Sequence, residues 1–173
     1  MPLRPIVPVR GSRIATLCTL AAFAACSAPQ QTALAPLRPL PESRALEVIL
    51  DAFRQVGVEP ELHRRIHIQH NRELEIDVAT RGHNHGVEYI MEQDRTDFGD
   101  ALPRRRTADS LLTVVGIGPD ANVDVLLLQD TDFRYEPIPE QNNESRPTLI
   151  EVEDRLRRNV VDYLTYLRQH NEL

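Results

Sequence analysis

Histidine is the residue type whose spacing in this chain comes closest to a chemical site. Five of the six histidines fall between positions 63 and 85, and two of them stand in a Gly-His-Asn-His-Gly segment at 82–86. Neutral imidazole is the commonest metal ligand, and zinc accepts three histidines plus a water molecule. The residues that could form such a zinc site are His63, His67, His83 and His85, with Asp77 adding a carboxylate.

The alternative interpretation, which we prefer, is that these histidines are separate surface residues in a turn and a loop. No HExxH segment and no paired cysteines accompany them. Other chemistry has even less support. All basic residues are arginine, which excludes Schiff-base and P-loop lysines. Ser110 and Ser145 have no histidine and acid context that would make a nucleophile. We therefore expect no catalytic residues and no cofactor.

The elements that must position these residues can be read from the hydrophobic pattern. A 3.6-residue apolar period predicts a helix over about 42–55, ended by Gly57, and a long last helix over about 148–170. Alternation predicts a hairpin in which His70 and Asn71 form the turn. If its first strand is extended, His63 and His67 share a face. The two strands of this hairpin are expected at 65–69 and 73–79. The remaining segments predict a strand at 87–91, a helical turn at 94–102, and strands at 111–117 and 123–128.

This order predicts a single α+β domain with an antiparallel or mixed sheet of about five strands, an N-terminal helix and a long C-terminal helix. The helix, hairpin and third strand resemble the scaffold of PD-(D/E)XK nucleases. That family needs an Asp and then an acid-x-Lys triplet on the next strand, and the nearest match is Asp77 followed by Glu88-Tyr89-Ile90. Ile90 stands where the lysine belongs. The resemblance therefore implies a scaffold and no nuclease chemistry.

The N-terminus has the order of an export signal. Residues 1–13 carry three arginines and no acid, and residues 14–25 are uncharged and mostly apolar but too short to span a bilayer. The run ends in Phe23-Ala24-Ala25-Cys26, which resembles a bacterial lipobox, usually Leu-Ala-Gly/Ala-Cys. The resemblance implies that Cys26 is lipidated after cleavage before it. The alternative is an ordinary signal peptide that is cut after Ala25 and leaves a free thiol.

The expected organisation is a signal peptide at 1–25, a lipidated Cys26 with a proline-rich tether to residue 41, and a domain at 42–173. The residue after Cys26 is Ser27 and not an Asp, and this resembles the pattern of lipoproteins that are transferred to the outer membrane. The formal net charge of −6 disfavours binding to nucleic acid. We expect an envelope lipoprotein, attached to a membrane through its lipid and facing the periplasm, which binds or scaffolds an unidentified envelope protein. The alternative is a zinc-binding domain, with hydrolase activity as a further possibility.

Overall fold

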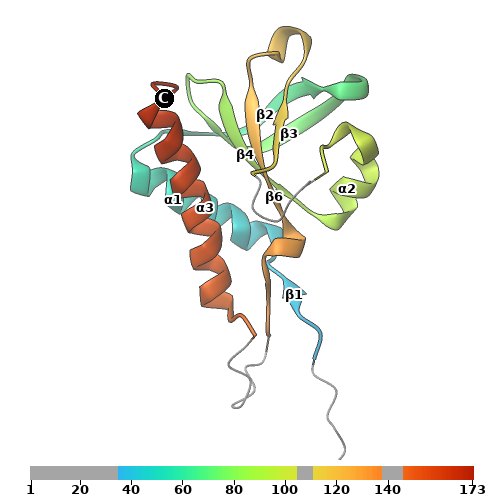
Figure 1. The fold of residues 1–173 in the computed structure, drawn as a ribbon, viewed down its shortest axis with the longest axis vertical. Helices are drawn as coiled ribbons and strands as arrows, with labels where there is room; N and C mark the ends of the chain where they lie inside the picture. The colour runs from blue at the N-terminus through green and yellow to red at the C-terminus, as the bar shows by residue number, and fades with distance from the viewer. Residues whose placement is uncertain (1–34, 105–110, 138–145) are drawn as a thin grey trace, which may run out of the picture. The chain divides into compact units, whose positions relative to one another are not determined.

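The structure is a computed structural model in which residues 35–104, 111–137 and 146–173 are described. Contacts divide the chain into residues 1–34 and a larger unit, Ala35–Leu173, which contains all of the described elements. Figure 1 shows these elements, which are, in chain order, β1 (Arg38–Pro39), α1 (Glu42–Val56), β2 (Pro60–Ile68), β3 (Arg72–Thr80), β4 (His85–Ile90), α2 (Glu92–Phe98), β5 (Thr113–Val115), β6 (Asp124–Gln129), β7 (Arg134–Tyr135) and α3 (Leu149–Gln169).

The main sheet has five strands in the order β2-β3-β4-β6-β5. The β4 and β6 strands are parallel, and the other neighbouring pairs are antiparallel. The sheet is therefore mixed, and the α+β architecture expected from the sequence, with its N-terminal helix and long C-terminal helix, is confirmed.

Each face of the sheet has its own apolar core. Helices α1 and α3 pack together over one face, where Phe53 and Leu164 meet Tyr89 and Leu128. On the other face, Ile76, Ile90 and Leu127 pack against Ala101 and Leu102, which follow α2. Along β4 and β6, successive side chains belong alternately to the two cores, because successive strand residues point to opposite faces. Both faces are thus buried at the centre of the sheet.

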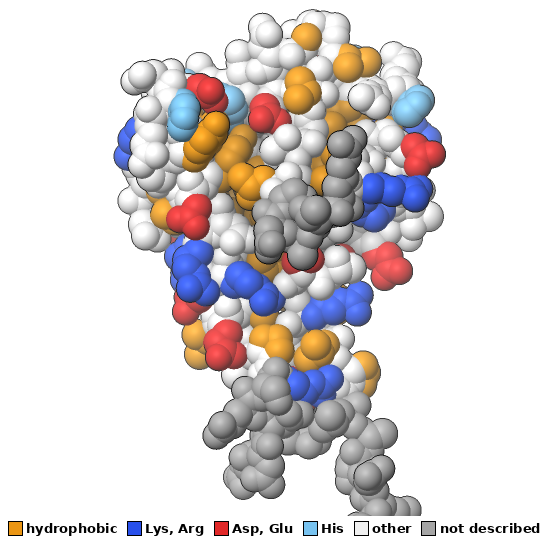
Figure 2. Space-filling model, in the orientation of Figure 1, with side chains coloured by type: hydrophobic (Ala, Val, Ile, Leu, Met, Phe, Trp, Pro, Cys, Tyr) orange, Lys and Arg blue, Asp and Glu red, His pale blue; other side chains and the backbone are white. Residues whose placement is uncertain are grey.

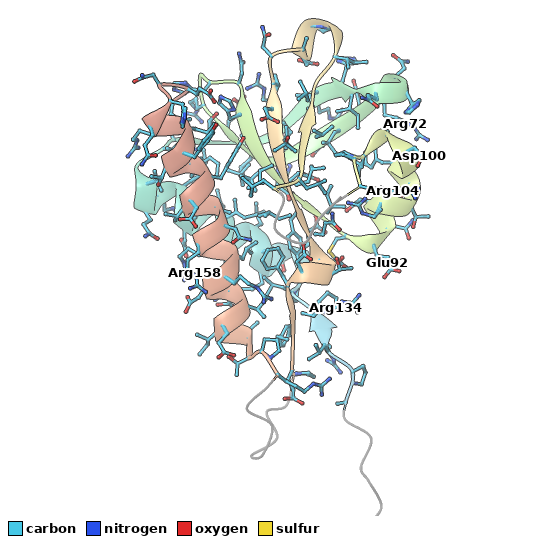
Figure 3. All side chains as sticks on the ribbon, viewed as in Figure 1. Arg72, Glu92, Asp100, Arg104, Arg134 and Arg158 are labelled. Carbon is cyan, nitrogen blue, oxygen red and sulfur yellow. The ribbon has the colours of Figure 1, made fainter. Side chains whose placement is uncertain are left out.

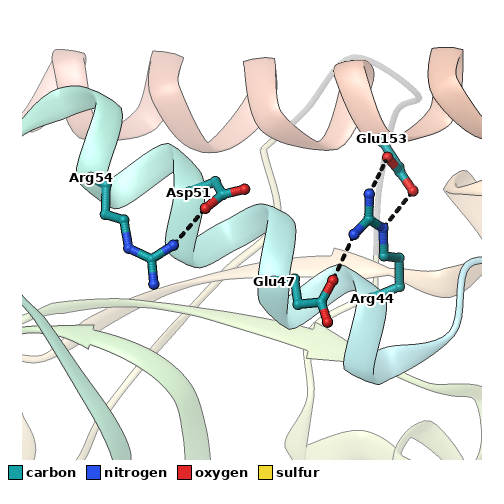
Figure 4. A network of polar contacts seen from close by, with 5 residues as sticks. All are labelled: Arg44, Glu47, Asp51, Arg54 and Glu153. Atoms are coloured by element: carbon teal, nitrogen blue, oxygen red, sulfur yellow. Dashed lines mark hydrogen bonds and ion pairs between the residues drawn. The ribbon is translucent and has the colours of Figure 1, made fainter.

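Polar contacts add to the packing of α1 against α3. Arg44 donates from Nε and Nη2 to the two carboxylate oxygens of Glu153, at 2.7 and 2.9 Å, and from Nη1 to Glu47 at 2.6 Å (Figure 4). These bonds raise the pKa of Arg44 and lower that of Glu153. The neighbouring pair of Arg54 and Asp51, one turn apart on α1, is more exposed than Glu153 and joins no second element.

The predicted ends of both long helices agree with the structure. Thr148 caps α3, because its hydroxyl accepts the Glu151 N–H while the Glu151 carboxylate accepts the Thr148 N–H. Gly57 ends α1 at a φ of 74°, a left-handed conformation that favours glycine. The predicted bounds, about 42–55 and about 148–170, lie within one residue of the observed ones.

Two short strands lie outside the sequence-based prediction. Arg38 pairs with Tyr135, and Pro39 pairs with Arg134, in a two-stranded ribbon of β1 and β7. Leu40, which follows β1, is fully buried, and its N–H donates to the Phe133 carbonyl. Residues 38–41 of the expected tether therefore belong to the folded unit. Within the described ranges, no helix has the length and apolar character needed to cross a bilayer.

Candidate functional site

Strands β3 and β4 separate part-way along their length. Their ladder consists of the pairs Val78 with Val87 and Ala79 with Gly86. Before Val78, β3 continues to pair with β2, while after Val87, β4 continues along β6. We call the point of separation, at Asp77 and Glu88, the β3–β4 fork.

Two carboxylates bridge this fork. The Asp77 N–H donates to Glu88 Oε2 at 2.7 Å, and the Tyr89 N–H donates to Asp77 Oδ2 at 2.8 Å. Each carboxylate thus accepts a backbone N–H of the opposite strand where the regular ladder has ended. Buried backbone donors need such partners, so the pair has a structural role whether or not it binds anything further.

Burial makes both carboxyl groups reluctant to ionise. Glu88 is 8% exposed, and burial together with the nearby Asp77 charge raises its pKa to about 9. Burial likewise raises the pKa of Asp77 to about 6, although the hydrogen bond from Tyr89 acts in the opposite direction. Glu42 and Asp94 add further negative charge near the fork. Paired acids with raised pKa values are typical both of functional sites and of structural networks.

The fork holds the residues that gave the nuclease resemblance. Asp77 lies on β3 and Glu88 lies on the neighbouring β4, as the PD-(D/E)XK pattern requires. Ile90, which stands at the lysine position, is 1% exposed and packs in the second core. The two acids of the pattern are therefore present, whereas an apolar, buried residue takes the place of the lysine.

His63 departs from the extended strand that the sequence suggested. It has a φ of 57°, and the ladder between β2 and β3 skips the position where it lies opposite Asp77. Its Nδ1 is 3.0 Å from Glu75 Oε1. The strand is therefore not extended at His63. Its ring contacts Glu75 and the His67 ring lies 3.9 Å from Glu73, and these two acids are alternate residues on one face of β3.

His67 lies at the other end of β2 and contacts a different acid. The Asp120 Oδ2 accepts the His67 N–H at 2.8 Å and lies 2.9 Å from its Nδ1. The Ile117 N–H donates to the His67 carbonyl at 2.7 Å. The hydrogen bonds from the His67 backbone and ring lower the pKa of Asp120. These contacts fasten β2, one edge strand of the sheet, to the turn that follows β5, the other edge strand.

His83 lies in the turn between β3 and β4, and His85 lies beside it at the start of β4. The His83 carbonyl accepts a bond from Arg64, while the His85 ring is mostly buried, with Nε2 3.5 Å from Glu172 Oε2. Burial lowers the pKa of His85. Its Nδ1 and the Oδ1 of Asp124 are both buried without a hydrogen-bond partner.

The structure therefore gives His63, His67 and His85 separate acidic neighbours. In the ranges that the structure describes, no three histidine, cysteine or acidic residues are arranged to hold a metal ion. The zinc site remains a prediction from the sequence. Cys26 lies outside the described residues.

The clearest candidate for a binding surface is formed by β5 and the residues on either side of it, which the sequence analysis treated only as an apolar strand. Side chains that point inward are buried, with Leu112 and Val114 each 5% exposed. Of the side chains that alternate with them, Leu111 is 63% exposed, Val115 51% and Ile117 38%, whereas Thr113 is half-buried. A signal was available, since residues 111–117 are apolar on both faces although only a central strand buries both.

The β5 edge also borders a depression. A hollow of about 240 Å³ lies between β5 and the end of β2, and its lining includes Gln69, Asp100, Pro103 and Thr113. Strand order places β5 at the margin of the sheet, with β6 as its neighbour among the described strands. Exposed apolar patches on an edge strand are typical of protein interfaces.

Comparison of the chain with protein-family models, with curated proteins and with solved structures found no match in any of the three.

Proposed function

We propose that this chain is a lipid-anchored protein of the bacterial cell envelope whose α+β domain binds another envelope protein. The anchor is supported by the charged and apolar segments of residues 1–25, by the lipobox-like end at Cys26, and by Ser27 after it. The folded unit begins at Ala35, which leaves a short connection between the two. The outer membrane, facing the periplasm, is the proposed location.

The observation that supports a binding function is the exposed apolar face of β5. Val115 on the edge strand β5, and Leu111 and Ile117 on either side of that strand, are apolar and exposed, so an extended segment of a partner can pair with β5 and cover them, up to the point where the Ile117 N–H already bonds to His67. Main-chain hydrogen bonds would supply affinity, and the apolar side chains would supply selectivity. The acidic charge argues for a protein partner and against nucleic acid.

Site-specific crosslinking tests this function. A photoreactive phenylalanine analogue at Val115 should give a discrete adduct in intact cells of the source organism, and Leu111→Asp should abolish it. The matched control is the same analogue at Leu62, which is 45% exposed on the opposite edge strand, β2. Absence of any adduct at Val115, or equal adducts at Val115 and Leu62, would contradict a binding surface on β5.

A second candidate function is divalent-cation binding at the fork. The pKa of Glu88 is raised to about 9, so at pH 8 its carboxyl group holds a proton that a hard cation such as Mg²⁺, Ca²⁺ or Mn²⁺ could replace, while Asp77, with a pKa of about 6, supplies an ionised carboxylate beside it. Titration of each metal into the protein at pH 8 should then release protons and raise the melting temperature. Glu88→Gln should remove both effects. Heat of binding unchanged by that substitution would place the metal elsewhere.

The zinc alternative is tested in the same titration. Zinc held by the histidine cluster would stabilise the protein, and His67→Ala and His85→Ala would each weaken that effect, whereas Glu88→Gln would leave it unchanged. Binding to the fork gives the opposite pattern. The two metal hypotheses therefore predict different sensitive residues.

A further inference from the structure

The residues that join the folded unit to its N-terminal segment lie at one end of that unit. β1 begins at Arg38 and pairs with β7, and the N–H of Glu136, just after β7, donates to the Pro147 carbonyl at 2.9 Å. Pro147 lies two residues before α3 begins at Leu149. Figure 1 shows β1, the end of β7 and the first turn of α3 together at this end, and the turn after β5 at the opposite end. We call the end that contains β1, the end of β7 and the first turn of α3 the tether end.

The tether end exposes two consecutive apolar side chains. Ile150 is 70% exposed, the highest value among the large hydrophobic side chains with described positions, and Leu149 is 38% exposed. Both precede the buried stripe of α3, which starts at Val152. These two exposed side chains are therefore not part of the packing of α3 on α1 and the sheet. Figure 2 shows apolar and arginine side chains side by side at this end.

The charges around these two side chains suit a phospholipid surface. Arg38 is exposed on β1, where it pairs with Tyr135, and Arg134 (Figure 3) lies opposite Pro39 on β7. The carboxylate of Glu151 is turned back to the Thr148 N–H, and Glu136 is buried against Arg146 at 2.9 Å. Two acids at this end thus have partners within the fold, while Arg38 is placed to meet headgroup phosphates.

We propose that the tether end is a membrane-contact surface, on which Leu149 and Ile150 enter the interfacial region of the bilayer that carries the lipid anchor. This inference rests on the proposed lipidation of Cys26. Residues 27–34 connect Cys26 to Ala35, and at full extension this connection spans only about 30 Å. The domain is therefore held close to the bilayer by the same end that exposes its apolar side chains. Its β5 face is then directed away from the bilayer, toward a partner.

The sequence offers a clean fluorescence test, because it contains no tryptophan. Ile150→Trp introduces a single reporter at the tether end, and Val115→Trp, at the exposed last residue of β5, is the matched control beside the turn at the opposite end. Each full-length variant is expressed in a bacterial host, purified with its lipid, and reconstituted in vesicles of phosphatidylethanolamine and phosphatidylglycerol.

We expect the Ile150→Trp emission to shift to the blue, and we expect brominated phospholipids to reduce it about twofold, as for side chains at the headgroup boundary. The Val115→Trp emission should be unaffected. Quenching at neither position, or equal quenching at both, would overturn the proposal.

Failure of the lipid anchor would be visible separately, in the intact mass of the purified protein. If the protein is cut after Ala25 and has no acyl chains, the proposed anchor is wrong. The free Cys26 thiol can then be coupled to a maleimide phospholipid, and the same two tryptophan variants still decide whether the tether end contacts lipid.

Discussion

The N–H of Asp77 donates to the carboxylate of Glu88 across a gap between two strands that have stopped pairing. A bond from Tyr89 to Asp77 runs in the opposite sense. Side chains thus replace the backbone ladder at the fork, and they do so with two acids that burial makes hard to ionise. The fork is therefore both a structural joint and the most unusual electrostatic feature of the fold.

The fork predicts that the protein loses stability as the pH rises. The pKa of Glu88 is about 9 in the folded state against 4.5 for an ordinary glutamate, so the folded state holds the proton more tightly. The resulting stabilisation is complete below pH 4.5 and is lost as the pH rises toward 9. We expect the free energy of unfolding to fall by several kcal/mol across this window, measured by urea denaturation.

Glu88→Gln should flatten this dependence, because the amide oxygen still accepts the Asp77 N–H and cannot ionise. Asp77→Asn is the matched control, and it should affect a lower window, between pH 3.8 and about 6. Parallel pH profiles for wild type and Glu88→Gln would show that Glu88 does not carry the effect.

The contact between His67 and Asp120 predicts a cost when the two edges of the sheet are released. Asp120→Ala removes the acceptor of the His67 N–H and its partner on the ring. We expect a loss of about 1 kcal/mol in the free energy of unfolding. Because the pKa of Asp120 is lowered, this contribution is present above pH 3.8 and disappears as the pH falls through the folded value.

A surface acid just after α2 supplies the control for that experiment. Asp100 contacts Arg104 at 2.9 Å, but both side chains are at least 80% exposed (Figure 3). Asp100→Ala should change stability by less than about 0.5 kcal/mol. Equal effects of the two substitutions would mean that Asp120 does not fasten the sheet edges.

The turn after β5 predicts a steric requirement for glycine at position 116. A Cβ atom there would lie 2.3 Å from the Asp120 carbonyl oxygen. Gly116→Ala should therefore destabilise the protein by about 2–3 kcal/mol. At Gly118, two residues on, an added Cβ meets no atom within 4 Å, and the φ is 61°. Gly118→Ala should therefore destabilise the protein only through this left-handed conformation, by about 1 kcal/mol. Similar melting temperatures for the two variants would contradict the close approach at Gly116.

The bidentate pair of Arg44 and Glu153 predicts a measurable link between α1 and α3. Glu153→Gln leaves one hydrogen-bond acceptor but removes the charge, and we expect the melting temperature to fall by about 2–4 °C. Asp51→Asn, in the neighbouring pair on α1, should leave the melting temperature unchanged. A fall in the Asp51→Asn variant as large as that in Glu153→Gln would assign the effect to net charge.

The sequence predicted the elements well because their signals are local. The glycine after α1 and the turn at His70 each depend on a few neighbouring residues. The β1–β7 ribbon was missed because a two-residue strand has no period, and Pro39 argued for a tether. The fork needs two strands to diverge, which the residues around Asp77 do not reveal.

The candidate site was harder to predict than the fold for the same reason. The histidines are close in the sequence, yet the left-handed backbone at His63 and the long-range partners of His67 and His85 separate their surroundings. The exposed face of β5 could have been suspected from its apolar residues, but which edge of the sheet it forms depends on the strand order.

The most direct test of the central claim is metabolic labelling with palmitate in a bacterial host, comparing wild type with Cys26→Ser. We predict that the wild-type protein is labelled and fractionates with membranes, and that Cys26→Ser is unlabelled. Equal labelling of both proteins, or no labelling of the wild type, would contradict the lipid anchor.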